Sequence, residues 1–362
     1  MPGVLAAGLT LLTARIGILQ SFEQTAYRAL FQLRGEQPWN DQVTVIEIDE
    51  VSLDAIGPFP WPRRYYTDLL KQLIPAEPSV IAFDILFAES SSDDVDFAQA
   101  MARHGNVVLA TAWDPQGDVI GPNGRVMEGA IATGHIHNQA DSDGITRFYQ
   151  SQVNGTLALS IKAVQRHYQQ LSLSISADSL QKFLWLNWRG TSHTAPRYSF
   201  SDVLSGEVPA KTFTNKIIFV GFTGKELDRM TTPYNQNVPT AGVYQHIVAA
   251  NNLLAQNHLK KLDIPTWPLL IIVGAVFGYW LFYRRFSRQL LGGLIVIVVW
   301  CGTVIVAFSY DYWLPIVTPL VTLITTANFV KLMERTFNQE CLSESRAASS
   351  VALTLHSSIK FP

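Results

Sequence analysis

The sequence predicts an α/β domain with a mostly parallel sheet flanked by helices, joined to one transmembrane helix at the N-terminus and three near the C-terminus. Two observations lead to this fold class: short β-branched runs alternate with segments of helical period, and three long apolar runs follow one another near the end. The composition agrees, because 48% of residues are hydrophobic and only 15% are charged, against about 25% charged in soluble proteins.

Four apolar runs predict the strands of the sheet. They are residues 43–49 (VTVIEID), 79–84 (SVIAFD), 106–111 (NVVLAT) and 216–221 (KIIFVG). Near-continuous apolar strands are typical of parallel sheets, because helices cover both of their faces.

Helical periodicity appears between these runs. Pro62 provides a helix start, and Tyr66, Leu69, Leu70 and Leu73 then form one apolar face. A second helix is predicted after Ser92, which would cap it, with one side formed by Val95, Ala98 and Met101. Residues 113–209 are interpreted as an insertion with its own helix and a strand at 183–188, and a last helix is predicted at 241–256.

Three apolar runs predict the C-terminal spans, at residues 267–283, 290–310 and 313–331. Each is long enough to cross most of a roughly 30 Å hydrocarbon layer. A buried soluble helix is the alternative for any one run, but three in succession with short loops favour a membrane bundle.

The distribution of basic residues predicts the orientation. Arg284, Arg285 and Arg288 lie between the first two runs, whereas the turn before the third has no Lys or Arg. The positive-inside rule therefore places the arginine loop and the tail, residues 332–362, in the cytoplasm. The domain at residues 21–262 is then outside, in the periplasm or extracellular space. Residues 1–20 are interpreted as an uncleaved span in which Arg15 reaches the outer interface; the alternatives are a start codon assigned too late and an amphipathic helix lying on the membrane.

Charge and cysteine content restrict the classes of function. The net charge of −2 gives no basic field for nucleic acid, so we expect no nucleic-acid partner. Both cysteines, Cys301 and Cys341, lie outside the predicted soluble domain. Cysteine content therefore does not decide the compartment.

Candidate binding residues follow the predicted strands, where ligands gather in open parallel sheets. Carboxylates that converge with arginines suit a polar small molecule or a cation. The candidates are Asp49, Arg63, Asp84, Asp143, Arg147 and Asp228. The competing interpretation is structural, because Asp at a strand end commonly caps a helix or closes a turn.

Signals for catalysis and metal binding are weak. The sequence has no G-x-S-x-G, H-E-x-x-H, Walker or C-x-x-C motif. His135 and His137 flank one residue without a third ligand close in sequence, so a turn or surface role is expected for them. His246 is expected to be a packed or interfacial residue. We expect no catalytic module, no cofactor and no metal in this chain.

Seven segments together resemble one family, and their order and spacing are more specific than any one of them. They are YRALFQLRG (27–35), VIEIDEVSLDAIGPFPWPRR (45–64), VIAFDILFAESSSDD (80–94), DSDGITR (141–147), SFSDVLSG (199–206), NKIIFVGFTG (215–224) and DRMTTPY (228–234). Over residues 17–335 the chain resembles the second type of cyclase/histidine-kinase-associated sensory extracellular domain.

The resemblance implies a sensory domain outside the bacterial cytoplasmic membrane, after one span and before three more. Relatives usually end in a cytoplasmic cyclase or kinase, whereas the tail here is too short for one. The segment GVYQHIVAANNLL also departs from the family pattern, with Val248 where Asn is expected.

The leading hypothesis is therefore a multi-pass sensor of the bacterial inner membrane that responds to an unknown small ligand or envelope state. A separate cytoplasmic signalling partner and a homodimer are both compatible with it. One alternative is an envelope metal-assisted hydrolase that uses Asp49, Asp84 and Asp228. Another is a structural membrane protein without a ligand.

Overall fold

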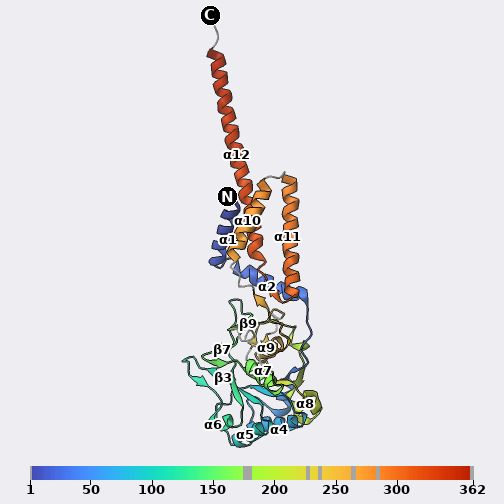
Figure 1. Ribbon diagram of the computed structural model, residues 1–362. Helices are drawn as coiled ribbons and strands as arrows, with labels where there is room; N and C mark the ends of the chain where they lie inside the picture. The colour runs from blue at the N-terminus through green and yellow to red at the C-terminus, as the bar shows by residue number, and fades with distance from the viewer. Residues whose placement is uncertain are drawn as a thin grey trace. The chain divides into compact units, whose positions relative to one another are not determined.

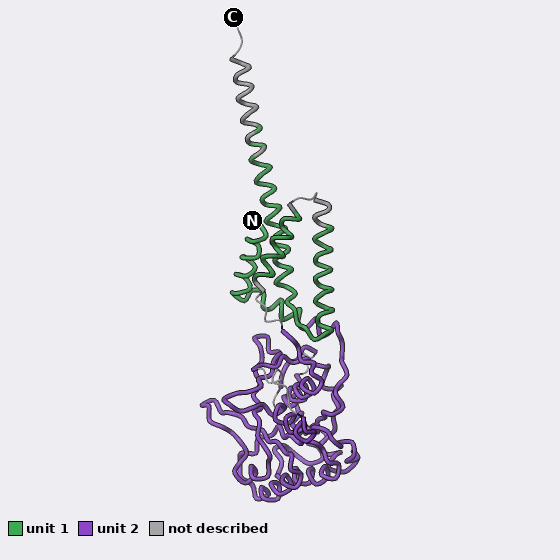
Figure 2. Tube along the Cα trace, viewed as in Figure 1, with its two compact units in different colours: residues 1–27, 262–362 green, residues 28–261 purple. Residues whose placement is uncertain are grey.

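The structure is a computed structural model that describes residues 2–173, 182–225, 229–234, 239–261, 266–282 and 286–358. The chain forms two compact units, shown in different colours in Figure 2. The α/β unit is Arg28–Lys261, and the helical unit combines Met1–Tyr27 with Leu262–Pro362. The two ends of the chain thus belong to the same unit.

A parallel sheet is the centre of the α/β unit (Figure 1). Its strand order is β10-β1-β11-β2-β3-β5, all parallel, with β4 antiparallel to the end of β3. The strands are β1 (Val43–Ile48), β2 (Val80–Asp84), β3 (Val107–Trp113), β4 (Val119–Ile120), β5 (Ala132–His135), β10 (Arg197–Ser199) and β11 (Ile217–Phe222). The predicted mostly parallel sheet is confirmed, and the four predicted strands are β1, β2, β3 and β11.

Helices cover both faces of this sheet (Figure 1). One face carries α3 (Glu50–Ile56), α4 (Arg63–Leu73), α5 (Asp94–His104) and α8 (Phe200–Ser205), and the other carries α7 (Leu159–Gln170) and α9 (Val243–Ala255). Shorter elements of the unit are α6 (Gly124–Met127), β6 (Phe148–Gln150), β7 (Gln152–Val153), β8 (Thr156–Leu157), β9 (Phe183–Trp185), β12 (Arg229–Met230) and β13 (Thr240–Ala241).

The core on the α4 side is aromatic. Tyr66 of α4 packs edge-on against Phe87, with ring centroids 5.2 Å apart, and Phe97 and Phe200 join the same cluster. The predicted apolar face of α4 is confirmed, since all four of its predicted positions are buried.

The prediction for α5 was wrong in detail. Asp93, rather than Ser92, is the N-cap residue, and Val95 is 44% exposed. Phe97 is fully buried beside Ala98 and Met101. Two of the three predicted positions, Ala98 and Met101, are thus buried as predicted, whereas Phe97 takes the place expected for Val95. The large Phe97 ring removes more apolar surface from water than Val95 would.

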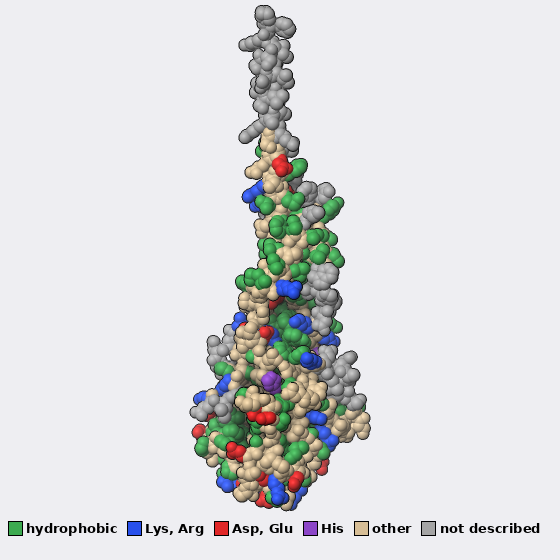
Figure 3. All heavy atoms as spheres, turned by 90° about the vertical axis from the view of Figure 1, so that its left-hand side faces the viewer, with side chains coloured by type: hydrophobic (Ala, Val, Ile, Leu, Met, Phe, Trp, Pro, Cys, Tyr) green, Lys and Arg blue, Asp and Glu red, His purple; other side chains and the backbone are tan. Residues whose placement is uncertain are grey.

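The helical unit contains α1 (Pro2–Arg15), the first residues of α2 (Gln20–Arg34), α10 (Thr266–Phe282), α11 (Phe286–Ser309) and α12 (Val317–Ser358). Hydrophobic side chains dominate its visible surface (Figure 3). Within the described residues, Leu291–Ser309 alone has the length and apolarity to cross a membrane as one straight helix. The bent pair α1 and α2 qualifies if counted as one span, and Pro268–Leu281 is a shorter apolar helix.

Two boundaries in this unit differ from the predicted ones. The apolar run at the N-terminus is not one helix, because α1 ends at Arg15 and α2 continues at an angle of 86° after a turn at Gly17, where φ is +83°. At the other end, α12 continues without a break from the third predicted span through most of the predicted tail.

Small residues bring α1 close to α10. Gly3, Ala6, Ala7 and Thr10 form the buried side of α1. A Cβ at Gly274 would lie 2.6 Å from the Gly3 carbonyl oxygen, so the two backbones touch. Glycines at i and i+4, here completed by Gly278, are typical of closely packed membrane helices.

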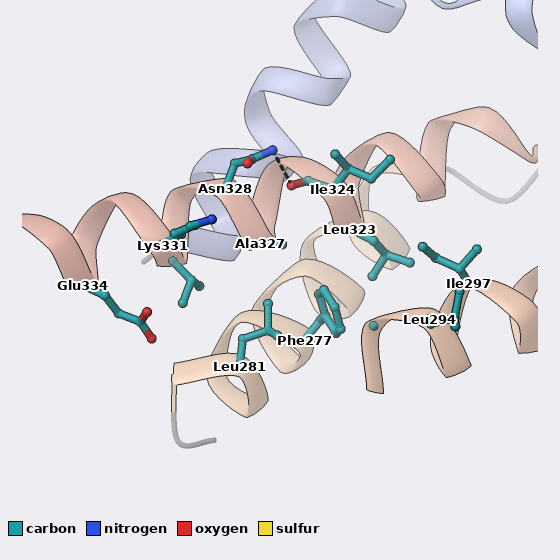
Figure 4. Close-up of a pocket in the computed structure, with 12 residues that line it drawn as sticks. Phe277, Leu281, Leu294, Ile297, Leu323, Ile324, Ala327, Asn328, Lys331 and Glu334 are labelled. Atoms are coloured by element: carbon teal, nitrogen blue, oxygen red, sulfur yellow. Dashed lines mark hydrogen bonds between the residues drawn. The ribbon is translucent and has the colours of Figure 1, made fainter. Parts of the chain in front are cut away.

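An apolar cavity of about 370 Å³ lies elsewhere in this unit, between α10, α11 and α12 (Figure 4). Phe277, Leu281 and Leu323 line it and belong to one buried cluster. Lys331 and Glu334 are the charged residues among those that line it.

The contact between α1 and α10 predicts the effect of a bulky side chain. Gly274→Leu should lower the free energy of unfolding of the full chain by about 3 kcal/mol, because overpacking forces the backbones apart. The matched control is Gly302→Leu on α11, where an added Cβ meets nothing within 4 Å. Unfolding of the detergent-solubilised protein, followed by circular dichroism, measures both. Equal stability of the two variants would contradict the packing.

Candidate functional site

Helix α9 carries an unusual number of buried polar side chains. Every residue from Val243 to Leu253 is buried. Buried polar groups without partners cost free energy, and most polar residues of α9 have partners in their surroundings. Among the described residues, Gln245 Oε1, His246 Nε2 and Asn251 Nδ2 lack a hydrogen bond. The partners of the α9 side chains define a network that we treat as the candidate site.

The first part of the network joins α9 to β2 and β6. Tyr149 Oη lies 2.6 Å from His246 Nδ1, and the Ser160 backbone N–H donates to Tyr149 Oη. Since that oxygen already accepts a hydrogen bond, its proton is directed to Nδ1. The neutral imidazole then carries its own proton on Nε2, which lies 3.7 Å from Asp84 Oδ1.

Burial keeps both histidines of this region uncharged. Burial, and then the nearby His135, lower the pKa of His246 to about 3. Burial, followed by charge repulsion from His137, lowers the pKa of His135 to about 4. The Asp84 carboxylate therefore faces a neutral imidazole at a distance too long for a hydrogen bond, and the contact would strengthen only on protonation or on a shift of α9.

The second part joins α9 to β1. Tyr244 Oη donates to Glu47 Oε1, and Arg197 Nη1 lies 3.2 Å from Glu47 Oε2. Burial raises the pKa of Glu47, and the bonds from Tyr244 and Arg197 oppose that rise. Glu47 and Asp84 occupy the same row of the sheet on either side of Gly221, whose missing side chain leaves room for α9.

The third part fixes the C-terminal half of α9. Asn252 Oδ1 accepts from the Asn187 N–H at 2.8 Å, and Asn252 Nδ2 donates to the Asn187 carbonyl. Asn187 Nδ2 in turn donates to the Asn257 carbonyl at 2.6 Å. At the preceding residue, Asn251 Oδ1 accepts from the Asn40 N–H.

The residues after Asn187 contact the segment that enters the α/β unit. Arg34, the last residue of α2, donates to the Trp188 carbonyl at 3.1 Å. The Gln37 N–H donates to the Arg189 carbonyl. Residues 187–189 therefore hold the chain both where it enters the unit, at α2, and where it leaves the unit, at α9.

A buried arginine stabilises the strand end that precedes residues 187–189. Arg147 is 1% exposed and forms two bonds to Asp143, at 2.6 and 2.7 Å, and one to Asp141 at 3.0 Å. Burial raises the pKa of Asp143, but Arg147 outweighs this and the net shift is downward. The Arg147 carbonyl accepts from the Leu186 N–H, so the ion pair positions the strand end next to residues 187–189.

The structure brings together two of the six predicted binding residues, Asp143 and Arg147. Asp49 caps α3 by accepting from the Ser52 N–H. Arg63 lies 3.4 Å from Asp94 and packs over the Phe87 ring. Asp84 faces His246, as described above, and Asp228 lies outside the described residues.

Several members of the network were missed in the sequence. Glu47 lies within an apolar strand, and Asn251 and Asn252 lie within an apolar helix. A polar residue inside an apolar run is rarely buried without a partner, so this pattern could have identified all three as network residues. Tyr149 has no comparable local signal. Among the described residues, no three His, Cys, Asp or Glu side chains gather as a metal site.

Comparison with known families gives one match, the CHASE2 domain, over residues 4–282. That is more than three quarters of the 362 residues. The chain belongs to the CHASE2 domain family. CHASE2 domains are extracellular sensory domains, so the expected resemblance is confirmed. No curated protein and no solved structure matches the chain.

The buried histidines of this CHASE2 domain predict a pH dependence. An unfolded histidine titrates near pH 6.5, whereas His135 and His246 in the folded domain titrate near 4 and 3. Between these values the unfolded state binds more protons, so the free energy of unfolding falls as the pH falls below about 6.5. Each histidine contributes a slope of about 1.4 kcal/mol per pH unit.

The variant His246→Gln isolates one of these contributions. It should reduce the slope between pH 4 and 6 by about 1.4 kcal/mol per unit, since glutamine keeps a hydrogen-bonding group but cannot take up the proton. Denaturant unfolding of the full chain at several pH values, followed by tryptophan fluorescence, measures it. A slope identical to that of the unchanged protein would contradict a neutral His246.

Proposed function

We propose that the chain is a sensor of the bacterial inner membrane, whose CHASE2 domain outside the cytoplasm responds to a small ligand or to an envelope state. In this proposal α1, α10, α11 and the first part of α12 cross the membrane. The orientation rests on the arginine loop, of which Arg284 and Arg285 lie outside the described residues.

The observation that carries the proposal is the composition of the helical unit in a CHASE2 family member. Helices from both ends of the chain pack together through small residues and present apolar side chains outward. A soluble protein rarely exposes so continuous an apolar surface, whereas a membrane bundle requires one. The domain between the two ends is then held on one side of the membrane.

The polar network supplies a route for the signal. The domain connects to the helical unit along the chain through α2 and through the segment after α9, and residues 187–189 hold both. A ligand that binds two arrangements of this network unequally would shift both connections together. The network is thus a coupling element, and the Asp143–Arg147 pair positions it.

In this proposal the signal passes from α2 to the start of α12. Within the helical unit, the Glu23 carboxylate of α2 accepts from the Ile316 and Thr318 N–H groups at 3.0 and 2.8 Å. A carboxylate at this place satisfies free backbone donors of a helix. Since α2 continues into the α/β unit, a movement of α2 is delivered directly to α12.

A cytoplasmic partner, or a second copy of the chain, would then bind α12 and respond to its movement. Its distal part exposes the large apolar side chains Leu332, Met333, Phe337 and Leu342. Apolar residues on a helix surface favour docking to another protein.

Reporter fusions test the proposed orientation. Alkaline phosphatase fused after Asn252 should be active, because the enzyme matures only outside the cytoplasm, and the same enzyme fused after Arg288 should be inactive. The second fusion is the matched control, since the two joints lie on opposite sides of one proposed span. An inactive fusion after Asn252 together with an active one after Arg288 would invert the topology and remove the sensor proposal.

A further inference from the structure

A polar cavity of about 540 Å³ lies at the amino-terminal edge of the sheet, the edge opposite to the predicted binding residues. Ser79 precedes β2, Asn106 precedes β3 and Asn215 precedes β11, and all three line it. The rest of the wall comes from the last turns of α5 and α7 and from the turn at Glu77. A cavity of this volume suits a small molecule.

Two opposite charges line this cavity without partners among the described residues. Arg103, in the last turn of α5, and Glu77, in the turn before β2, are both exposed. Neither forms an ion pair or a side-chain hydrogen bond with the residues that the structure describes. The cavity therefore offers one cationic and one anionic group to a ligand.

A third group is buried and unsatisfied. His167 is 3% exposed, and its Nδ1 lies 2.6 Å from the Ser79 hydroxyl oxygen. Its Nε2 has no hydrogen-bond partner among the described residues. Burial lowers the pKa of His167, so the ring is neutral. Its Nε2 is itself closed off from solvent, so His167 forms part of the wall without presenting that nitrogen to the cavity.

Other members of the wall are held rigidly. His104 Nε2 donates to the Pro78 carbonyl at 3.1 Å, and His104 Nδ1 accepts from the Asn106 N–H. Arg166 Nη2 donates to Asn106 Oδ1 at 2.8 Å. Because these side chains are fixed by the protein, a ligand would lose little free energy in ordering them.

The distribution of charge selects the ligand class. Arg103 supplies donors and Glu77 supplies an acceptor, beside the polar residues Ser79, Asn106 and Asn215 of the same wall. The C-terminal end of a helix favours a cation, and guanidinium groups favour carboxylates. Of these two charged residues, a simple anion would interact favourably only with Arg103, and a simple amine only with Glu77.

We propose that this cavity binds a small zwitterion of the α-amino acid class, with Arg103 at its carboxylate and Glu77 at its ammonium group. The inference concerns a second site, apart from the network around α9. It does not depend on membrane orientation, so the phosphatase fusions and the binding experiment can fail separately.

The test uses the full chain in detergent micelles, with each of the twenty L-amino acids added separately at about 10 mM. At least one should raise the temperature of thermal unfolding, because a ligand that binds only the native state stabilises it. Calorimetry then gives the dissociation constant. Arg103→Gln and Glu77→Gln should each weaken that amino acid about tenfold or more, the usual loss for a charge-assisted hydrogen bond.

The matched controls are Arg125→Gln and Glu128→Gln, two exposed charges near α6 that do not line the cavity. They should leave the dissociation constant unchanged. Acetate and methylamine, which carry only one charge each, should bind far more weakly than the amino acid. The proposal is overturned if no amino acid shifts unfolding, if the two cavity variants bind as tightly as the controls, or if acetate or methylamine alone binds equally well.

Discussion

The structure of the α/β unit depends on a single constraint: α9 is buried on every side and yet carries tyrosine, histidine and asparagine side chains. In a close-packed interior such polar groups are stable chiefly where they find partners with good geometry. The hydrogen-bond partners come from β1, β6 and Asn187, which are distant in the sequence. The requirement fixes the position of α9 relative to the sheet far more narrowly than apolar packing would.

This constraint links the architecture to a sensory role. The chain leaves the α/β unit just after α9 and enters it through α2, and the same short segment bonds to both. Polar networks are directional, so a small displacement of one member breaks contacts elsewhere instead of being absorbed gradually. Few arrangements of such a domain satisfy its hydrogen bonds. A sensor with distinct states requires a small number of arrangements of this kind.

The sequence predicted the fold more completely than the site. The four apolar strands and the helix with Tyr66, Leu69, Leu70 and Leu73 were recognisable because each buries a repeating apolar pattern. The short strands β5 and β10 were not, since three or four residues without an apolar run carry too little pattern. The helix α3 was also missed, and the Asp49 side chain that caps it was interpreted as a candidate ligand. Asp at a strand end serves both purposes, and the local sequence does not distinguish them.

The sequence by itself determined the class of the sheet, the division into polar and apolar regions and the CHASE2 family, because these depend on composition, period and motif order along the chain. The tertiary structure alone decided which polar groups meet. Asp143 and Arg147 are four residues apart and their pairing follows from a local turn, whereas Tyr149 and His246 are 97 residues apart. Contacts of the second kind depend on how two helices and a strand pack in three dimensions, and no periodicity in the chain records that.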